Sequence, residues 1–109
     1  MKKQIIYTIL ILLLSSTAVA WDGVVSGTVS KIHVAHGANY AFRVYLDGSP
    51  EMCGNGHNWA YINEADSNYQ VFVSTLLSAK AMSSDITIYS NRQNGDPSGY
   101  CKIGYVIFN

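Results

Sequence analysis

The stretch CGNGHNWAYINEADSNY, from Cys53 to Tyr69, passes from loop to strand to helix within seventeen residues. Its first four residues contain two glycines, which permit the tight backbone turns of a loop. Trp59–Ile62 is a short apolar run of the kind that forms a buried strand. Asn63–Ser67 is polar again, and Asp66 or Ser67 is suited to cap a following helix. The stretch therefore predicts a glycine-rich loop, a strand and the start of a helix.

Cys53 and Cys101 are the two cysteines of the chain. An even number of cysteines in an exported protein predicts a disulfide, because secreted and periplasmic compartments are oxidising. A bond between these residues closes most of the domain, and loop-closure entropy assigns it roughly 4 kcal/mol of stability. The chain has neither a CxxC motif nor a second cysteine–histidine pair at zinc-binding spacing. We therefore expect a disulfide, no metal site and no cofactor.

The N-terminus has the pattern of a secretory signal peptide. Lys2 and Lys3 supply the positive charge, Ile5–Leu14 is a short apolar segment, and the residues 18–20 (AVA) form an A-x-A cleavage motif. The apolar segment is shorter than the roughly 20 residues that span a bilayer. We therefore expect residues 1–20 to be a signal peptide cleaved after Ala20. Residues 21–109 are then a single small domain without a membrane span, either secreted or periplasmic.

The hydrophobic pattern of residues 21–109 predicts a mainly β domain with one helix. Trp21–Val34 is expected to form a bent strand, with Gly27 marking a bulge, and Tyr40–Asp47 alternates most clearly between apolar and polar residues. These two strands make a hairpin. From Asn68 to Met82, apolar residues recur every three or four positions, which predicts a helix of about four turns. The other predicted elements are the strands Trp59–Ile62, Ile86–Ser90 and Lys102–Phe108 and the turn Asn91–Gly99.

This element order, β-β-β-α-β-β, is that of a small OB-like barrel, stapled here by the disulfide. A meander sheet packed against one helix is the alternative. The last strand is apolar on both faces, which predicts burial on two sides or contact with another subunit.

Charges in residues 21–109 are few and scattered. Five lysines and arginines stand against seven aspartates and glutamates, a net charge of −2. No basic stripe or run of cations is present, so nucleic acid is not an expected partner.

The titratable residues do not form a recognisable catalytic motif. His33, His36 and His57 lie in a strand, a turn and the glycine-rich loop, and no GxSxG or HExxH motif accompanies them. Glu64 and Asp66 precede the predicted helix, where acids interact with the positive end of the helix dipole. We therefore expect no enzyme. A small hydrolase that uses His57 and Glu64 is the least favoured alternative.

Aromatic residues are more numerous than the core of so small a domain can bury. Tyr45, for example, lies on the face of its strand opposite Phe42 and Val44. Exposed tyrosines beside Asn, Ser and Asp are typical of sugar binding, and they are equally typical of subunit interfaces. The sequence leaves both interpretations open.

Three segments occur in a distinctive order: residues 22–27 (DGVVSG), residues 72–76 (FVSTL) in the helix, and residues 86–89 (ITIY) in the next strand. This order resembles the B subunits of AB5 toxins of the subtilase-cytotoxin and typhoid-toxin type, which have D-G-x-x-S-G, F-S-T-L-Y and V-R-I-Y-Y. The resemblance implies an OB fold, a ring of five subunits and binding of sialylated or other cell-surface glycans. It also implies that Ser26 contacts the glycan, with Asp22 near the same site.

Two departures separate the chain from that family. The sugar-contacting tyrosine of the post-helix strand is matched by Ser90 here, and Tyr89 lies one residue earlier. A family cysteine near the end of the second strand is also missing. Two functions follow as expectations: a secreted binding module for glycans that uses Asp22, Ser26 and Tyr89, or a periplasmic protein-interaction or inhibitor domain.

Overall fold

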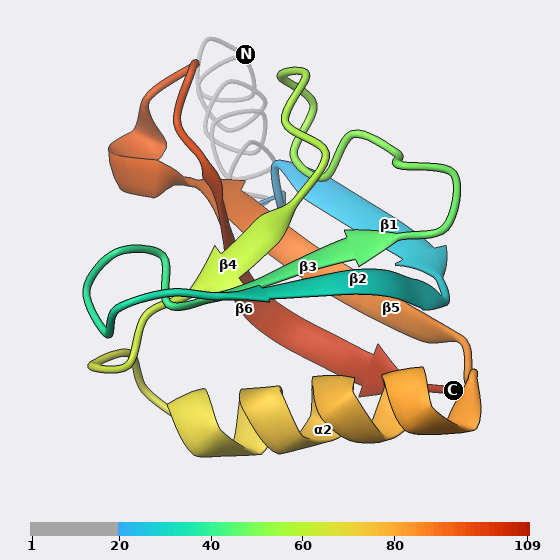
Figure 1. Ribbon diagram of the computed structural model, residues 1–109. Coiled ribbons are helices and arrows are strands. Elements are labelled where there is room, and N and C mark those ends of the chain that lie inside the picture. Colours follow the sequence, from blue (N-terminus) through green and yellow to red (C-terminus); the bar gives the residue numbers. More distant parts are fainter. Residues whose placement is uncertain (1–19) are drawn as a thin grey trace, which may run out of the picture.

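A computed structural model describes residues 20–109, so the predicted signal peptide, except for Ala20, lies outside the described residues. The elements are the strands β1 (Gly23–Gly27), β2 (Val29–Val34), β3 (Phe42–Leu46), β4 (Ala60–Ile62), β5 (Ile86–Arg92) and β6 (Cys101–Phe108), the helix α2 (Tyr69–Met82) and the 3-10 turn η1 (Gln93–Gly95). The described part is therefore mostly β with a single α-helix, as predicted (Figure 1). Across these residues, no helix combines the length and the apolar character needed to cross a bilayer.

The strands form one curled sheet in the order β1-β5-β6-β4-β3-β2. The predicted bent strand is in fact two strands, because β1 pairs antiparallel with β5 whereas β2 pairs antiparallel with β3. Only Thr28 separates β1 from β2, so the chain itself holds the two ends of the sheet together and the sheet curls into a half-barrel (Figure 1). The β4–β6 pair is parallel. Assignment to the OB class stays a prediction.

The inner side of the sheet forms the core. In β3, the side chains of Phe42, Val44 and Leu46 are buried, while Arg43 and Tyr45 are half-buried on the outer side. This alternation follows from the two-residue repeat of a strand and confirms the sequence pattern.

Helix α2 covers one end of the half-barrel (Figure 1). Its Leu76 and Ala79 are buried in the core. The predicted cap by Asp66 or Ser67 is wrong, because the residue before the helix is Asn68, in the left-handed conformation and without a side-chain cap. Asp66 instead accepts a hydrogen bond from the backbone N–H of Asn63, which closes the turn that precedes the helix.

Strand β5 is two residues longer than predicted. Asn91 and Arg92 belong to the strand and pair with the start of β6, so the turn begins at Gln93 rather than at Asn91. Long-range pairing with β6 extends β5 although asparagine has a low intrinsic strand propensity.

A β-bulge in β6 determines which of its side chains are exposed. Tyr89 lies opposite Tyr105, but the next residue, Ser90, lies opposite Ile103, so Gly104 is the extra residue of the bulge. The bulge changes the phase of the strand: Ile103 faces the core, whereas Tyr105 is 53% exposed. The prediction that β6 is buried on both sides is therefore wrong within this chain, and its outer apolar residues face solvent.

The Cys53–Cys101 disulfide is present, as predicted. It fastens the loop before β4 to the start of β6, and Met52 and Cys53 are fully buried. The buried Ser90 hydroxyl donates to the carbonyl oxygen of Met52 at 2.9 Å, and Arg92 Nε donates to that of Cys53 at 3.0 Å. The loop is thus bound to β5 as well as to β6.

Candidate functional site

The first of the predicted ligand-binding residues, Asp22, holds β1 against the end of β5. Its carboxylate accepts a hydrogen bond from the backbone N–H of Arg92 at 2.7 Å, and its own N–H donates to Asn91 Oδ1 at 3.1 Å. These bonds position the residue before it, Trp21. In this structure, the role of Asp22 is therefore to fix the backbone at the start of β1 against β5.

Ser26 and Tyr89, the other two predicted ligand-binding residues, lie on the outer face of the β1–β5 pair but in different rows. Ser26 Oγ is 2.7 Å from Thr87 Oγ1, in the strand partner directly opposite. Tyr89 lies opposite Val24 and is flanked by two aromatic rings, Trp21 at 5.6 Å and Tyr105 at 5.1 Å between centroids. The structure thus brings Asp22 and Tyr89 close to Trp21, and leaves Ser26 one row further along the sheet.

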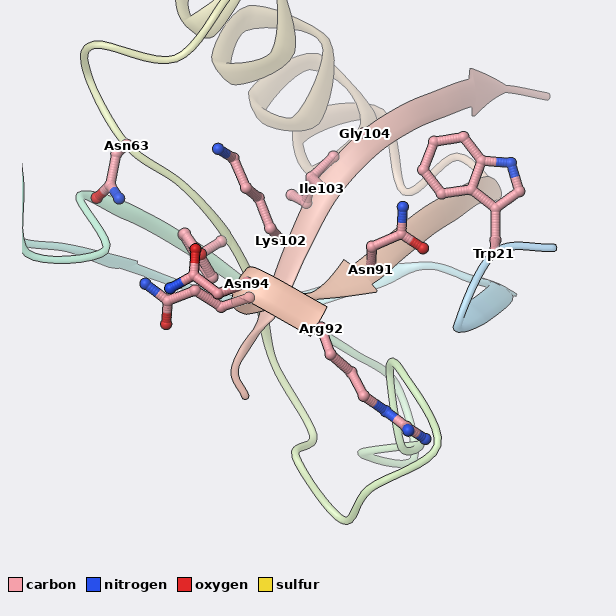
Figure 2. Close-up of a pocket in the computed structure, with 10 residues that line it drawn as sticks. Trp21, Asn63, Asn91, Arg92, Asn94, Lys102, Ile103 and Gly104 are labelled. Carbon is pink, nitrogen blue, oxygen red and sulfur yellow. The ribbon is translucent and has the colours of Figure 1, made fainter. Parts of the chain in front are cut away.

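A cavity of about 370 Å³ lies beside Trp21 (Figure 2). It extends from Trp21 across β6 and the end of β5 toward η1 and the residue after β4. Its lining includes Trp21, Lys102, Gly104 and four residues with amide side chains, Asn63, Asn91, Gln93 and Asn94. This cavity is our candidate functional site, and we call it the Trp21 pocket.

Trp21 can form this wall because Gly104 has no side chain. A Cβ atom added to Gly104 would lie 2.5 and 2.7 Å from two carbon atoms of the indole ring. Gly104 has an ordinary backbone φ, so the requirement for glycine is one of space rather than of backbone conformation. The bulge in β6 therefore leaves space for the indole of Trp21 next to Gly104. Trp21 remains 38% exposed.

The ammonium group of Lys102, which lines the pocket, is paired with a carboxylate next to the pocket. Lys102 Nζ is 3.0 Å from a carboxylate oxygen of Asp66, and the lysine side chain remains 48% exposed. Burial raises the pKa of Tyr61 to about 12, and the neighbouring Tyr40 and Asp66 add to the increase. The Tyr61 phenol, which also lines the pocket, therefore stays protonated at neutral pH.

Trp59 and Tyr61 belong to an aromatic cluster that adjoins the Trp21 pocket through Tyr61. Tyr40 is the centre of this cluster, with ring centroids 4.7 Å from Tyr61 and 4.9 Å from Tyr100. Trp59 is 4.7 Å from Tyr100, and the Arg43 guanidinium lies 5.1 Å from the Trp59 ring. This cluster packs the residues before Cys101 against the sheet.

The histidine and acidic residues do not form a metal site. Within residues 20–109, no group of three or more His, Cys, Asp or Glu side chains is placed to hold a metal ion. His57 Nε2 is 3.0 Å from the carbonyl oxygen of Ser98, and its ring packs against Tyr100. In this arrangement, His57 joins its own loop to the turn before β6.

Most residues of the Trp21 pocket were not predicted from the sequence. Asn91 and Gln93 were assigned to a turn, and Lys102 only to a strand. Two features of the sequence could have located the site: a tryptophan at the expected start of the mature chain, and a glycine within an apolar strand. Glycine inside a strand indicates a bulge or a close approach of another group, and Gly104 has both features.

Comparison of the chain with protein-family models, curated proteins and solved structures finds no match. The resemblance to toxin B subunits therefore depends on its short motifs alone.

Proposed function

We propose that this domain is a secreted or periplasmic, non-enzymatic carbohydrate-binding module whose site is the Trp21 pocket. The observation that carries the proposal is a partly exposed tryptophan next to four amide side chains around one cavity. A sugar ring has apolar C–H faces that pack on an aromatic ring, and hydroxyl groups that bond with amides. The volume of about 370 Å³ lies within the ordinary range of small-molecule sites.

The other predicted residues have supporting roles in this proposal. Asp22 fixes the backbone next to Trp21, and Tyr89 packs edge-on against the indole ring. Both residues therefore orient the tryptophan rather than contact the sugar.

Replacing Trp21 with alanine is expected to weaken glycan binding at least tenfold. A tenfold loss corresponds to about 1.4 kcal/mol, within the range that truncation of a buried anchor tryptophan costs. Gly104→Ala should weaken binding in the same way, because its new methyl group displaces the indole without changing any polar group. The measurement is a glycan array, followed by titration of the best glycan with purified protein.

Trp59→Phe is the matched control, because Trp59 is a tryptophan that does not line the pocket, and it should bind like the wild type. The absence of signal on every glycan, or unchanged binding by Trp21→Ala, contradicts the proposal. Ser26→Ala separates this site from the one implied by the toxin resemblance. It should have little effect if the Trp21 pocket is the site, and it should abolish binding if Ser26 contacts the glycan.

A second candidate function is binding of another polypeptide, and it is supported by an exposed apolar face on β1, β5 and β6. Val24 and Tyr105 are each 53% exposed and lie in one row of the sheet, on either side of Tyr89. Ile107, in the next row, is 37% exposed. Contiguous exposed apolar residues are typical of protein interfaces.

If this face joins copies of the chain, sedimentation at micromolar concentration should reveal a species larger than a monomer. The double variant Val24→Ser/Tyr105→Ser should then sediment as a monomer, because it removes apolar area from the centre of the face. Lys31→Ser, on the exposed surface of β2, is the control. A monomeric wild-type protein contradicts self-association, including the ring of five implied by the resemblance.

A further inference from the structure

Three of the four amide groups of the Trp21 pocket, those of Asn63, Asn91 and Gln93, have a common orientation. Asn63 Oδ1 accepts a hydrogen bond from the N–H of Ala41 at 3.2 Å, and Asn91 Oδ1 accepts from the N–H of Asp22 at 3.1 Å. A backbone N–H can only donate, so these contacts identify which amide atom is oxygen. Each oxygen is directed into the protein, and the NH₂ group of each side chain is the end left for the pocket.

Gln93 continues this pattern. Its Oε1 accepts from the Tyr40 hydroxyl at 3.0 Å. No hydrogen bond within residues 20–109 involves the NH₂ group of Gln93, Asn63 or Asn91. The pocket therefore presents three amide donors whose oxygens each accept a hydrogen bond from the protein.

The cations of the pocket differ in their availability. The Arg92 side chain is directed away from the cavity (Figure 2), where it donates to the carbonyl oxygens of Cys53 and Gly54. Lys102 has one carboxylate partner, Asp66, but an ammonium group has three N–H donors. An exposed ion pair of this kind contributes little free energy, so a second anion can share the ammonium group. Among residues 20–109, no acidic side chain lines the cavity.

We infer that the Trp21 pocket binds a carboxylate group of its ligand, through Lys102 and the NH₂ groups of Asn63, Asn91 and Gln93. A carboxylate only accepts hydrogen bonds and carries a negative charge, and it therefore complements these three NH₂ donors and the ammonium group of Lys102. A hydroxyl group can accept from one of these donors, but it has no charge to pair with Lys102. The inference rests on the proposed function for the position of the site, and it adds the chemical group that the site selects.

The test compares ligands that differ only in this group. Methyl β-D-glucuronide and methyl β-D-glucoside share a ring and differ by a carboxylate. Acetylated dipeptides with a free and an amidated C-terminus offer the same choice without a sugar. We expect the glucuronide to bind at least tenfold more tightly than the glucoside in calorimetric titrations, with a preference that falls as the salt concentration rises.

Two variants test the residues. Lys102→Met removes the charge and keeps the length of the side chain. Asn91→Asp keeps the oxygen that accepts from Asp22 and replaces the NH₂ donor with a negatively charged oxygen. Both should reduce the tenfold preference to twofold or less. Lys80→Met is the control, because Lys80 lies on α2 with its ammonium group on the carbonyl oxygen of Ser30, and it should leave the preference unchanged.

The outcomes separate this inference from the proposed function. Equal binding of the two sugars, with loss of both in Trp21→Ala, overturns the carboxylate inference and supports the carbohydrate module. Binding of the free-acid peptide but of neither sugar, with dependence on Lys102, supports the carboxylate inference and contradicts the carbohydrate module. An unchanged preference in Lys102→Met and Asn91→Asp overturns the inference, as does the absence of binding by any of the four probes.

Discussion

Replacing Cys53 and Cys101 together with alanine is expected to lower the free energy of unfolding by about 4 kcal/mol. The two cysteines are 48 positions apart, and cross-linking a loop of this length removes roughly that much conformational entropy from the unfolded chain. A domain of this size has a total stability on the order of 5–15 kcal/mol, so the bond accounts for a large part of it. The melting temperature should fall by roughly 15–30 °C.

Thermal denaturation followed by circular dichroism, with and without a reducing agent, measures this effect. Reduction should lower the melting temperature of the wild-type protein toward that of the double variant and should not change the variant. Two free thiols in the purified wild-type protein, together with an unchanged melting temperature in the variant, contradict the prediction.

Replacing Gly23 with alanine is expected to lower the free energy of unfolding by about 2–5 kcal/mol. A Cβ atom at this position meets the carbonyl oxygen of Met52 and lies 2.7 Å from the Cα atom of Cys53. Both are backbone atoms of the disulfide loop, which cannot move aside without strain in the loop or in β1. Displacing Met52 also separates its carbonyl from the buried Ser90 hydroxyl, and an unsatisfied buried polar group costs about 1–3 kcal/mol.

Chemical denaturation of Gly23→Ala and Gly104→Ala, measured side by side, tests this argument. Both glycines have ordinary backbone φ values, and both would place a Cβ atom in close contact. At Gly104, the contact is with the far end of the exposed Trp21 side chain, which can swing away, so we expect a loss below about 1 kcal/mol. Equal free energies of unfolding for Gly23→Ala and Gly104→Ala contradict the argument that the atoms next to Gly23 belong to a rigid backbone.

Several features of the fold could be predicted because their signals are local or covalent. The helix follows from its three- and four-residue spacing, and the alternation in β3 identifies Phe42, Val44 and Leu46 as buried. The disulfide follows from counting two cysteines in a chain whose N-terminus predicts export. Each of these inferences needs only neighbouring residues or the number of cysteines.

The predictions of secondary structure were wrong where pairing between distant strands, rather than the local sequence pattern, determined the structure. Residues 21–34 form two strands because their halves pair with different partners, β5 and β3, which a local window does not reveal. Asn91 and Arg92 extend β5 because the start of β6 lies opposite them. The cap of α2 is a left-handed Asn68, since Asp66 is used by the preceding turn.

The sequence by itself determined the class of this domain: mainly β, one helix, one disulfide. Only the tertiary structure decided the candidate site, because strand register brings residues from the start, the middle and the end of the domain together in the Trp21 pocket. A bulge that shifts β6 by one residue leaves room for an indole over Gly104, and hydrogen bonds to distant backbone orient the amides of Asn63 and Asn91. Register is set by contacts between strands, and the periodicity of a single strand does not encode it.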